Sequence, residues 1–165
     1  MAQNFRSWLY AFWQFTWGLP QNMVGLLFFL VLSPFGKVRL FHNCLVTDIH
    51  LKKKSLGGIT LGMFVFLFLS DETYKKRPDY VHDLTIHEFG HTVQSLILGP
   101  FWQLTVGLPS FTWANLVWKY FMHKNHSYYW LYCEGWANVL GCRFSKDEFR
   151  TEHFRNHGRY DKPMK

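Results

Sequence analysis

The sequence predicts an α+β fold in which helices pack on a small antiparallel sheet, and three observations support this. Apolar residues make up 48% of the 165 residues and aromatic residues 20%, enough for a substantial core. Near the start of the chain, apolar residues recur every three or four positions, as in a helix. Between residues 37 and 69 the pattern is typical of strands. The length fits one domain, 1–165, with an apolar part at 1–36 and a core at 37–165.

Two apolar helices are expected in residues 1–36. The first has Phe5, Trp8 and Phe12 on one face, and Gly18 to Pro20 ends it. The second covers residues 21–32, but its unbroken apolar part is shorter than the roughly 20 residues that a spanning helix needs. These helices either dock on the core or lie in a membrane interface. We therefore expect a membrane-associated protein, on an unknown side, or a cytoplasmic one if it is soluble.

Two strands follow. Residues 37–51 alternate and are rich in β-branched and aromatic types, and residues 63–69 form a continuous apolar run typical of a buried strand. Lysines 52–54 and the Gly57-Gly58 pair lie between them and predict a turn. We expect the two strands to pair as a hairpin.

The segment after residue 80 carries the most informative motif. His87 and His91 are four residues apart, so on a helix both imidazoles leave one face and can bind a single zinc ion. Glu88 would lie beside the ion, where it can take a proton from a zinc-bound water. Asp83 or Thr85 is expected to cap this helix. An alternative role for Glu88 is a capping box with Thr85.

A third zinc ligand must come from elsewhere in the chain, and Glu134 is the preferred candidate. Asn138 lies four residues after Glu134 and could accept a hydrogen bond from a ligand imidazole. Gly135 and Ala137 are small enough to let the two helices approach closely. The alternative third ligands are His123, His126, Cys133 and Asp147.

The apolar run at 92–118 is not expected to be one straight span. Such a span would place the two histidines and Glu134 about 30 Å apart, which zinc bonds of about 2 Å forbid. Gly99-Pro100 should end the motif helix, and Gly107 to Pro109 should break the run again.

Charge and cysteine content limit the remaining function classes. The 18 basic and 11 acidic residues give a net charge of +7, which favours anionic partners. Residues 7–36, 55–70 and 92–118 carry no Asp, Glu, Lys or Arg, so either the core is unusually large or part of the surface contacts lipid. The three cysteines form no CxxC pair, which argues against a disulfide framework. No phosphate-binding loop or RNA-binding pattern occurs, so no nucleic-acid partner is expected.

The two motifs together resemble the gluzincin metallopeptidase pattern, HExxH followed by ExxA[DN], as in membrane-bound CAAX-type prenyl-protein endopeptidases and their bacterial heat-shock relatives. The resemblance implies a zincin-like fold with an active-site helix and a Glu-bearing helix on a small antiparallel sheet. It also implies that His87, His91 and Glu134 bind zinc and that Glu88 is the general base. Asn138 stands where Asp is commoner.

A closer resemblance covers most of the chain. Residues 17–22, 57–62 and 87–109 look like a group of small uncharacterised bacterial proteins with an HE[YF]GHTxQSxxLGP signature. That group has no established substrate, so the resemblance strengthens the fold and zinc predictions alone.

The sequence thus predicts a zinc metallopeptidase that hydrolyses a peptide or protein substrate, with residues 37–165 as its catalytic core, at a membrane surface. His126, Tyr128 and Tyr129 precede the Glu134 helix and are candidate donors to the developing oxyanion. One alternative is a catalytically inactive zinc-binding or membrane-associated scaffold protein. Another is a small membrane protein whose HExxH motif is coincidental.

Overall fold

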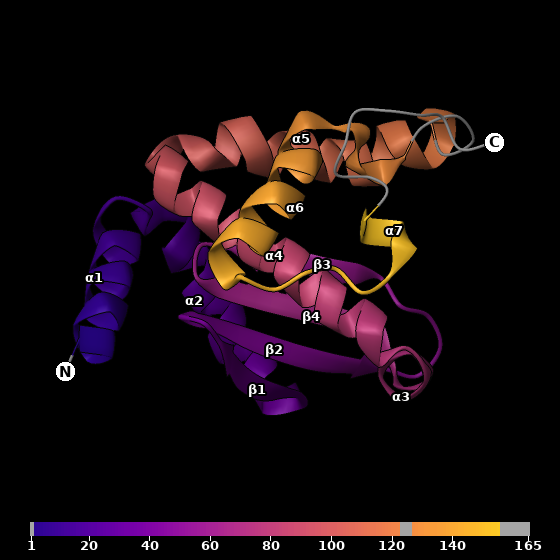
Figure 1. Cartoon of the computed structure of the whole chain (residues 1–165), viewed down its shortest axis with the longest axis horizontal. Helices are drawn as coiled ribbons and strands as arrows, with labels where there is room; N and C mark the ends of the chain where they lie inside the picture. The colour runs from indigo at the N-terminus through magenta and orange to yellow at the C-terminus, as the bar shows by residue number, and fades with distance from the viewer. Residues whose placement is uncertain (1, 123–126, 156–165) are drawn as a thin grey trace.

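The computed structural model describes residues 2–122 and 127–155 and has the predicted α+β class (Figure 1). Its helices and strands, in chain order, are α1 (Ala2–Thr16), α2 (Leu19–Leu32), β1 (Gly36–Phe41), β2 (Cys44–Leu51), β3 (Gly57–Leu61), β4 (Phe64–Ser70), α3 (Asp71–Lys76), α4 (Pro78–Leu98), α5 (Leu108–Thr112), α6 (Tyr132–Ser145) and α7 (Glu152–Arg155).

The sheet is mixed, so the prediction of an antiparallel sheet is wrong. Its strand order is β1-β2-β4-β3. The outer pairs, β1 with β2 and β3 with β4, are antiparallel, whereas the central pair, β2 with β4, is parallel. The predicted strand at 37–51 is two strands joined at His42, whose φ is 51°, and it does not form a hairpin with residues 63–69.

Burial explains this strand order. β4 is apolar and buried along most of its length, so it occupies a central position where both faces are covered. β3 contains Gly57, Gly58 and the exposed Ile59, which suit an edge strand. β4 is therefore inserted between β2 and β3, and β2 becomes its parallel neighbour.

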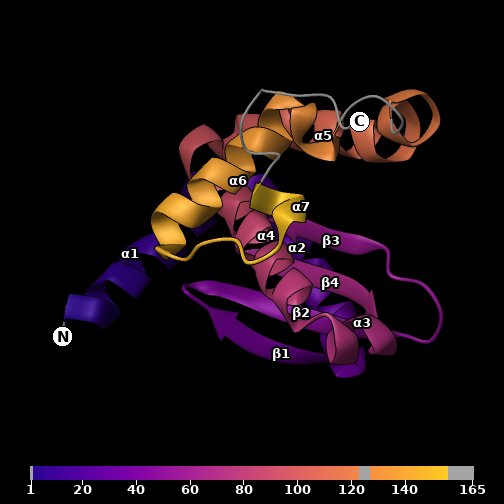
Figure 2. The same cartoon turned by 45° about the vertical axis from the view of Figure 1, so that its right-hand side comes forward.

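Helices cover both faces of the sheet. α4 lies on one face and α6 packs on α4 (Figures 1 and 2). Val65, Leu67 and Leu69 of β4 point into this core. The alternate residues Phe64 and Phe66 point to the other face, where α2 packs.

α4 begins at Pro78, well before the expected caps, so neither Asp83 nor Thr85 caps it. The Asp83 carboxylate is buried and accepts hydrogen bonds from the backbone N–H groups of Arg150 and Thr151, at 2.8 and 2.7 Å. Asp83 thereby fixes the chain that follows α6 onto α4. Since Thr85 and Glu88 lie inside the helix, the capping-box role for Glu88 is excluded.

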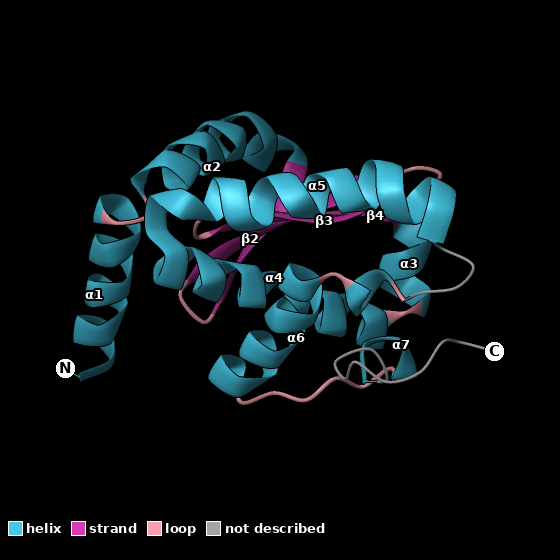
Figure 3. Ribbon diagram, turned by 90° about the horizontal axis from the view of Figure 1, so that it is seen from above, coloured by secondary structure: helices cyan, strands magenta, loops and turns pink. Residues whose placement is uncertain are grey.

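α4 ends at Leu98 as predicted, and Gly99 follows with a φ of 54°. The predicted second break at Gly107 is wrong, because Gly107 has helical dihedral angles (φ −58°, ψ −55°). The chain runs through the π-helical segment Gln103–Gly107, α5 and a second π-helical segment, Trp113–Met122, as one long rod (Figure 3). Wider π-helical turns accommodate Pro109, which has no N–H to donate.

In the part of the chain described, no single helix is long and apolar enough to cross a membrane. One pair of segments, Trp8–Thr16 and Leu19–Phe35, meets the length and hydropathy requirements together, but the pair is bent by 105°.

Candidate metal centre

Close contact between α4 and α6 builds the site. A Cβ atom on Gly90 of α4 would overlap the Ala137 carbonyl of α6, and one on Gly141 of α6 would overlap the Ile86 carbonyl of α4. Glycine at these positions lets the two backbones touch. Ala137 was predicted to allow this approach, whereas Gly135 faces the Tyr129 carbonyl instead.

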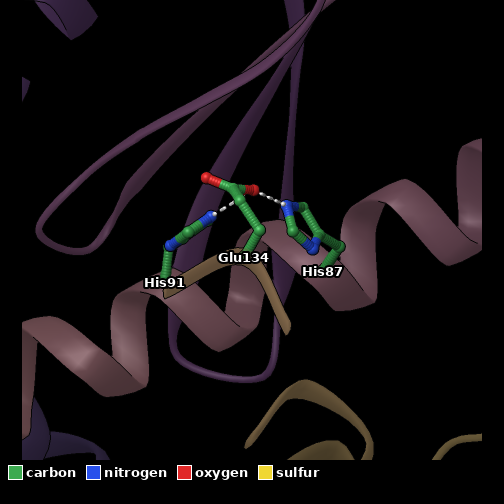
Figure 4. A group of neighbouring side chains, drawn as sticks. All are labelled: His87, His91 and Glu134. Atoms are coloured by element: carbon green, nitrogen blue, oxygen red, sulfur yellow. Dashed lines mark ion pairs between the residues drawn. The ribbon is translucent and has the colours of Figure 1, made fainter. Parts of the chain in front are cut away.

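The structure brings together His87, His91 and Glu134, the residues predicted to bind metal, and all three are buried. Both imidazoles reach from α4 toward the Glu134 carboxylate (Figure 4). Glu134 Oε2 lies 3.2 Å from His87 Nε2 and 3.5 Å from His91 Nε2. Two donors about 2.05 Å from one ion, at a tetrahedral angle, lie about 3.3 Å apart. The two separations from Glu134 therefore fit a shared ion, and all three ligand atoms lie within 4.8 Å of one another.

Hydrogen bonds at the far side of each ring orient the imidazoles. His87 Nδ1 lies 2.7 Å from Asn138 Oδ1, and His91 Nδ1 lies 2.7 Å from Gln94 Oε1. An amide oxygen only accepts, so both Nδ1 atoms carry protons. In the neutral rings, both Nε2 lone pairs then point at Glu134.

Three acceptors converging on one point need a positive charge between them. Neither Glu134 oxygen has a hydrogen-bond donor, although both are buried. Leaving buried carboxylate oxygens without a partner is costly, and a cation removes that cost. The cluster of His87, His91 and Glu134 can thus bind a metal ion.

Without an ion, protons must supply the positive charge. Burial of His91 opposes its protonation, but the Glu134 carboxylate overcomes this and raises the pKa of His91 to about 9. Burial of Glu134 likewise opposes its ionisation, but the neighbouring imidazoles, His91 foremost, hold its pKa well below the usual range. Glu134 is therefore ionised throughout the physiological range.

Asn138 takes the position predicted for it, but Gln94 was missed. Besides accepting from His91, Gln94 donates through Nε2 to the Cys133 carbonyl at 2.7 Å, which ties α4 to the first turn of α6. Gln94 lies three residues after His91, a spacing that places both side chains on one helical face. Gln94 could therefore have been predicted from its helical spacing, as Asn138 was.

Glu88 lies beside the cluster, against the edge strand β3. Thr60 Oγ1 donates to Glu88 Oε2 at 2.6 Å, and a Cβ atom on Gly58 would overlap Glu88 Oε1. The Glu88 charge also contributes to the raised pKa of His91. Sequence reasoning missed Thr60 and Gly58, which share one face of β3 because strand residues alternate.

The predicted oxyanion donors lie in different settings. The Tyr129 ring packs edge-on against the His87 ring, with 5.3 Å between centroids. Burial raises the pKa of Tyr128 well above its ordinary value, and the charges of Glu134 and Glu88 raise it further, so this phenol stays protonated. His126 lies outside the described residues.

Of the alternative third ligands, His123 also lies outside the described residues. Among the described residues, the group that could hold a metal ion contains neither Cys133 nor Asp147. The Cys133 side chain is buried. Glu134 is therefore the third member of the cluster in the described part of the chain.

Comparison with known proteins gives no relative: no family model matches the chain, and no curated protein and no solved structure matches it.

Proposed function

We propose that this chain is a zinc metallopeptidase of the zincin type, in which Glu88 activates water for attack on a peptide bond. One observation carries the proposal: ligand atoms of His87, His91 and Glu134 converge, and Glu134 Oε2 lies at separations from both Nε2 atoms that suit one tetrahedral ion. Two imidazoles and one carboxylate are a donor set typical of catalytic zinc, which keeps its fourth position open.

Zinc at this position would lower the pKa of a bound water toward about 7 and polarise a carbonyl. Glu88 would take the proton from the attacking water and deliver it to the leaving amine. Thr60 holds one oxygen of the Glu88 carboxylate, which fixes the orientation of the base. The Tyr128 hydroxyl is a candidate donor to the developing oxyanion.

The edge strand favours a peptide as substrate. β3 is at the border of the sheet, and its residues Gly58 and Thr60 contact Glu88. An extended peptide that added to this edge would pass directly by the proposed base. Gly58 has no side chain, so the backbone of β3 lies close to Glu88 at that point.

The test is the Glu88→Gln variant, which keeps the size of the side chain and removes its basicity. We expect zinc content to stay at one ion per chain while cleavage of a peptide library falls by about 10²- to 10⁴-fold. Elemental analysis measures the first quantity, and mass spectrometry of the peptides measures the second.

Two further variants serve as controls for the metal. His91→Ala and Glu134→Ala should each lose zinc. Tight zinc binding by Glu134→Ala would remove Glu134 from the ligand set. A wild-type protein that binds zinc and cleaves no peptide would support the inactive scaffold instead.

A further inference from the structure

The N-terminal helices have partly inverted polarity: they bury several polar side chains and expose many large apolar ones. Gln14, Gln21 and Asn22 are fully buried. The exposed residues of the same helices include Trp8, Phe12, Trp13, Met23, Leu27 and Leu30. In a water-soluble protein the informative exceptions are buried polar groups and large exposed apolar patches, and these helices show both.

The buried polar side chains join α1 and α2 to each other and to α4. Asn22 Nδ2 donates to Gln14 Oε1 at 2.8 Å, and Gln21 Nε2 donates to Ser95 Oγ at 2.9 Å. Gln14 Nε2 donates to the Thr92 carbonyl at 3.3 Å. Hydrogen bonds of this kind hold helices together in lipid, where burial of apolar side chains no longer drives the helices to associate.

Exposed polar side chains on the apolar helices bond to their own backbone. Thr16 Oγ1 donates to the Phe12 carbonyl at 2.8 Å. On the long helical rod after Gly99, Thr105 Oγ1 donates to the Phe101 carbonyl at 2.9 Å, and an Asn115 amide N–H bonds one turn back in the same way. In hydrocarbon, where water is absent, polar groups need such internal partners.

The apolar surface extends over three elements that face different ways. α1 projects from one end of the molecule, α2 covers the far face of the sheet, and the rod after Gly99 runs along the top edge (Figures 1 and 3). The rod exposes Leu104, Leu108 and Phe111, and the turn just before it exposes Phe101. The charged helix α3 lies at the opposite end from α1 (Figures 1 and 2). A second copy of the chain would cover one of these faces. The acyl chains of a lipid bilayer, in contrast, can contact all three.

We propose that α1, α2 and the uncharged part of the rod insert into the acyl-chain region of a phospholipid bilayer, with α3 and lysines 52–54 in water. The 105° bend between α1 and α2 fits entry and return on one side rather than a straight crossing. This inference goes beyond the proposed catalysis, since its test needs neither metal nor peptide cleavage.

The test compares the full chain with a Leu27→Asp/Leu30→Asp double variant, both purified in detergent and mixed with phosphatidylcholine vesicles during detergent removal. Leu27 and Leu30 are 62% and 63% exposed, so the change spares the core. We expect wild type to float with the vesicles, also in about 1 M salt, where the Debye length is about 3 Å. The double variant should partition at least about tenfold less.

The matched control is Leu56→Asp, which changes an equally apolar side chain that is 73% exposed and lies beside lysines 52–54. It should float like wild type, and circular dichroism should show that each variant keeps its helices. Wild type that stays in the lipid-free fraction would overturn the proposal. So would a lipid-free dimer that the double variant splits into monomers, because a second copy would then cover the surface.

Discussion

Two neutral amides, Asn138 and Gln94, determine which nitrogen of each imidazole faces Glu134. Each amide oxygen lies 2.7 Å from an Nδ1 atom and fixes the proton there. Partners of this kind hold both the tautomer and the ring orientation of a metal ligand. The geometry of the cluster therefore depends on residues that are not members of it.

The Gln94→Leu variant tests this dependence. We expect metal affinity to fall by about 10- to 100-fold, because His91 loses the acceptor that orients it and the Cys133 carbonyl loses its donor. A competition titration with a chelating dye measures the affinity. The control is Gln103→Leu, the same change on the rod after α4, which should bind metal as wild type does. Equal affinities for the two variants would show that Gln94 does not support the site.

The pKa of His91 predicts a pH effect in the metal-free protein. Glu134 raises this pKa in the folded state from 6.5 to about 9. A raised histidine pKa stabilises the folded protein below the unfolded pKa, and this stabilisation is lost as the pH rises through the folded pKa. The free energy of unfolding, measured with a chelator present, should therefore fall between about pH 6.5 and 9.

The same measurement on Glu134→Gln gives the control, since this variant lacks the charge that raises the pKa. Its stability should change less over the same pH range. A metal-free wild type whose stability is constant across that range would contradict the assigned contact between His91 and Glu134.

Helical spacing is what made the cluster predictable. His87 and His91 share one face of a helix because they are four residues apart, and Asn138 follows Glu134 by the same interval. Thr60 could not be found in this way. Its contact with Glu88 depends on which strand borders the sheet and on how α4 crosses it, and neither is a local property of the sequence.

Among the elements, the pair α4 and α6 is the one that assembles the cluster. Two of its residues come from α4 and the third from α6, so the distance between the helices sets the distance between the proposed donor atoms. That distance is short because Gly90 and Gly141 leave room for the facing backbone.

The Gly90→Ala variant tests this coupling. Its methyl group would overlap the Ala137 carbonyl and force α4 and α6 apart. We expect a loss of about 1–3 kcal/mol in the free energy of unfolding. We also expect weaker metal binding, by about tenfold for each 1.4 kcal/mol of binding free energy lost. Chemical denaturation and the dye competition measure the two quantities.

The control for Gly90→Ala is Gly107→Ala on the rod, where a Cβ atom would lie 3.1 Å from the Trp102 ring. This change can lower stability, but it should leave metal affinity unaltered. If Gly90→Ala lost stability and kept the affinity of wild type, close helix contact would not be what positions Glu134.

The strands show a limit of local patterns. Alternation and apolar runs found strands in the correct part of the chain, but they could not say which strands would be neighbours. β4 lies between β2 and β3 because it is the most thoroughly buried strand. Which strand takes the central position depends on the burial of all the strands in the sheet. The predicted antiparallel pairing failed for that reason.

At the scale of the whole molecule, the sequence predicted an unusual surface without locating it. The uncharged runs at 7–36 and 92–118 left open whether the core was large or the surface met lipid. The structure exposes apolar residues of both runs and buries Gln14, Gln21 and Asn22. Composition could not predict this inversion, because it depends on which side chains point inward and which point outward.

The neutrality of the amide partners has a consequence for the choice of ion. Glu134 and Glu88 are both buried and together contribute two negative charges, while Asn138 and Gln94 contribute none. A divalent cation brings this sum to zero, whereas a monovalent or trivalent ion leaves one unit of charge in the protein interior. An electroneutral assembly avoids the Born energy of an isolated charge in a medium of low permittivity. We therefore expect the cluster to bind a divalent ion in preference to a monovalent or trivalent one.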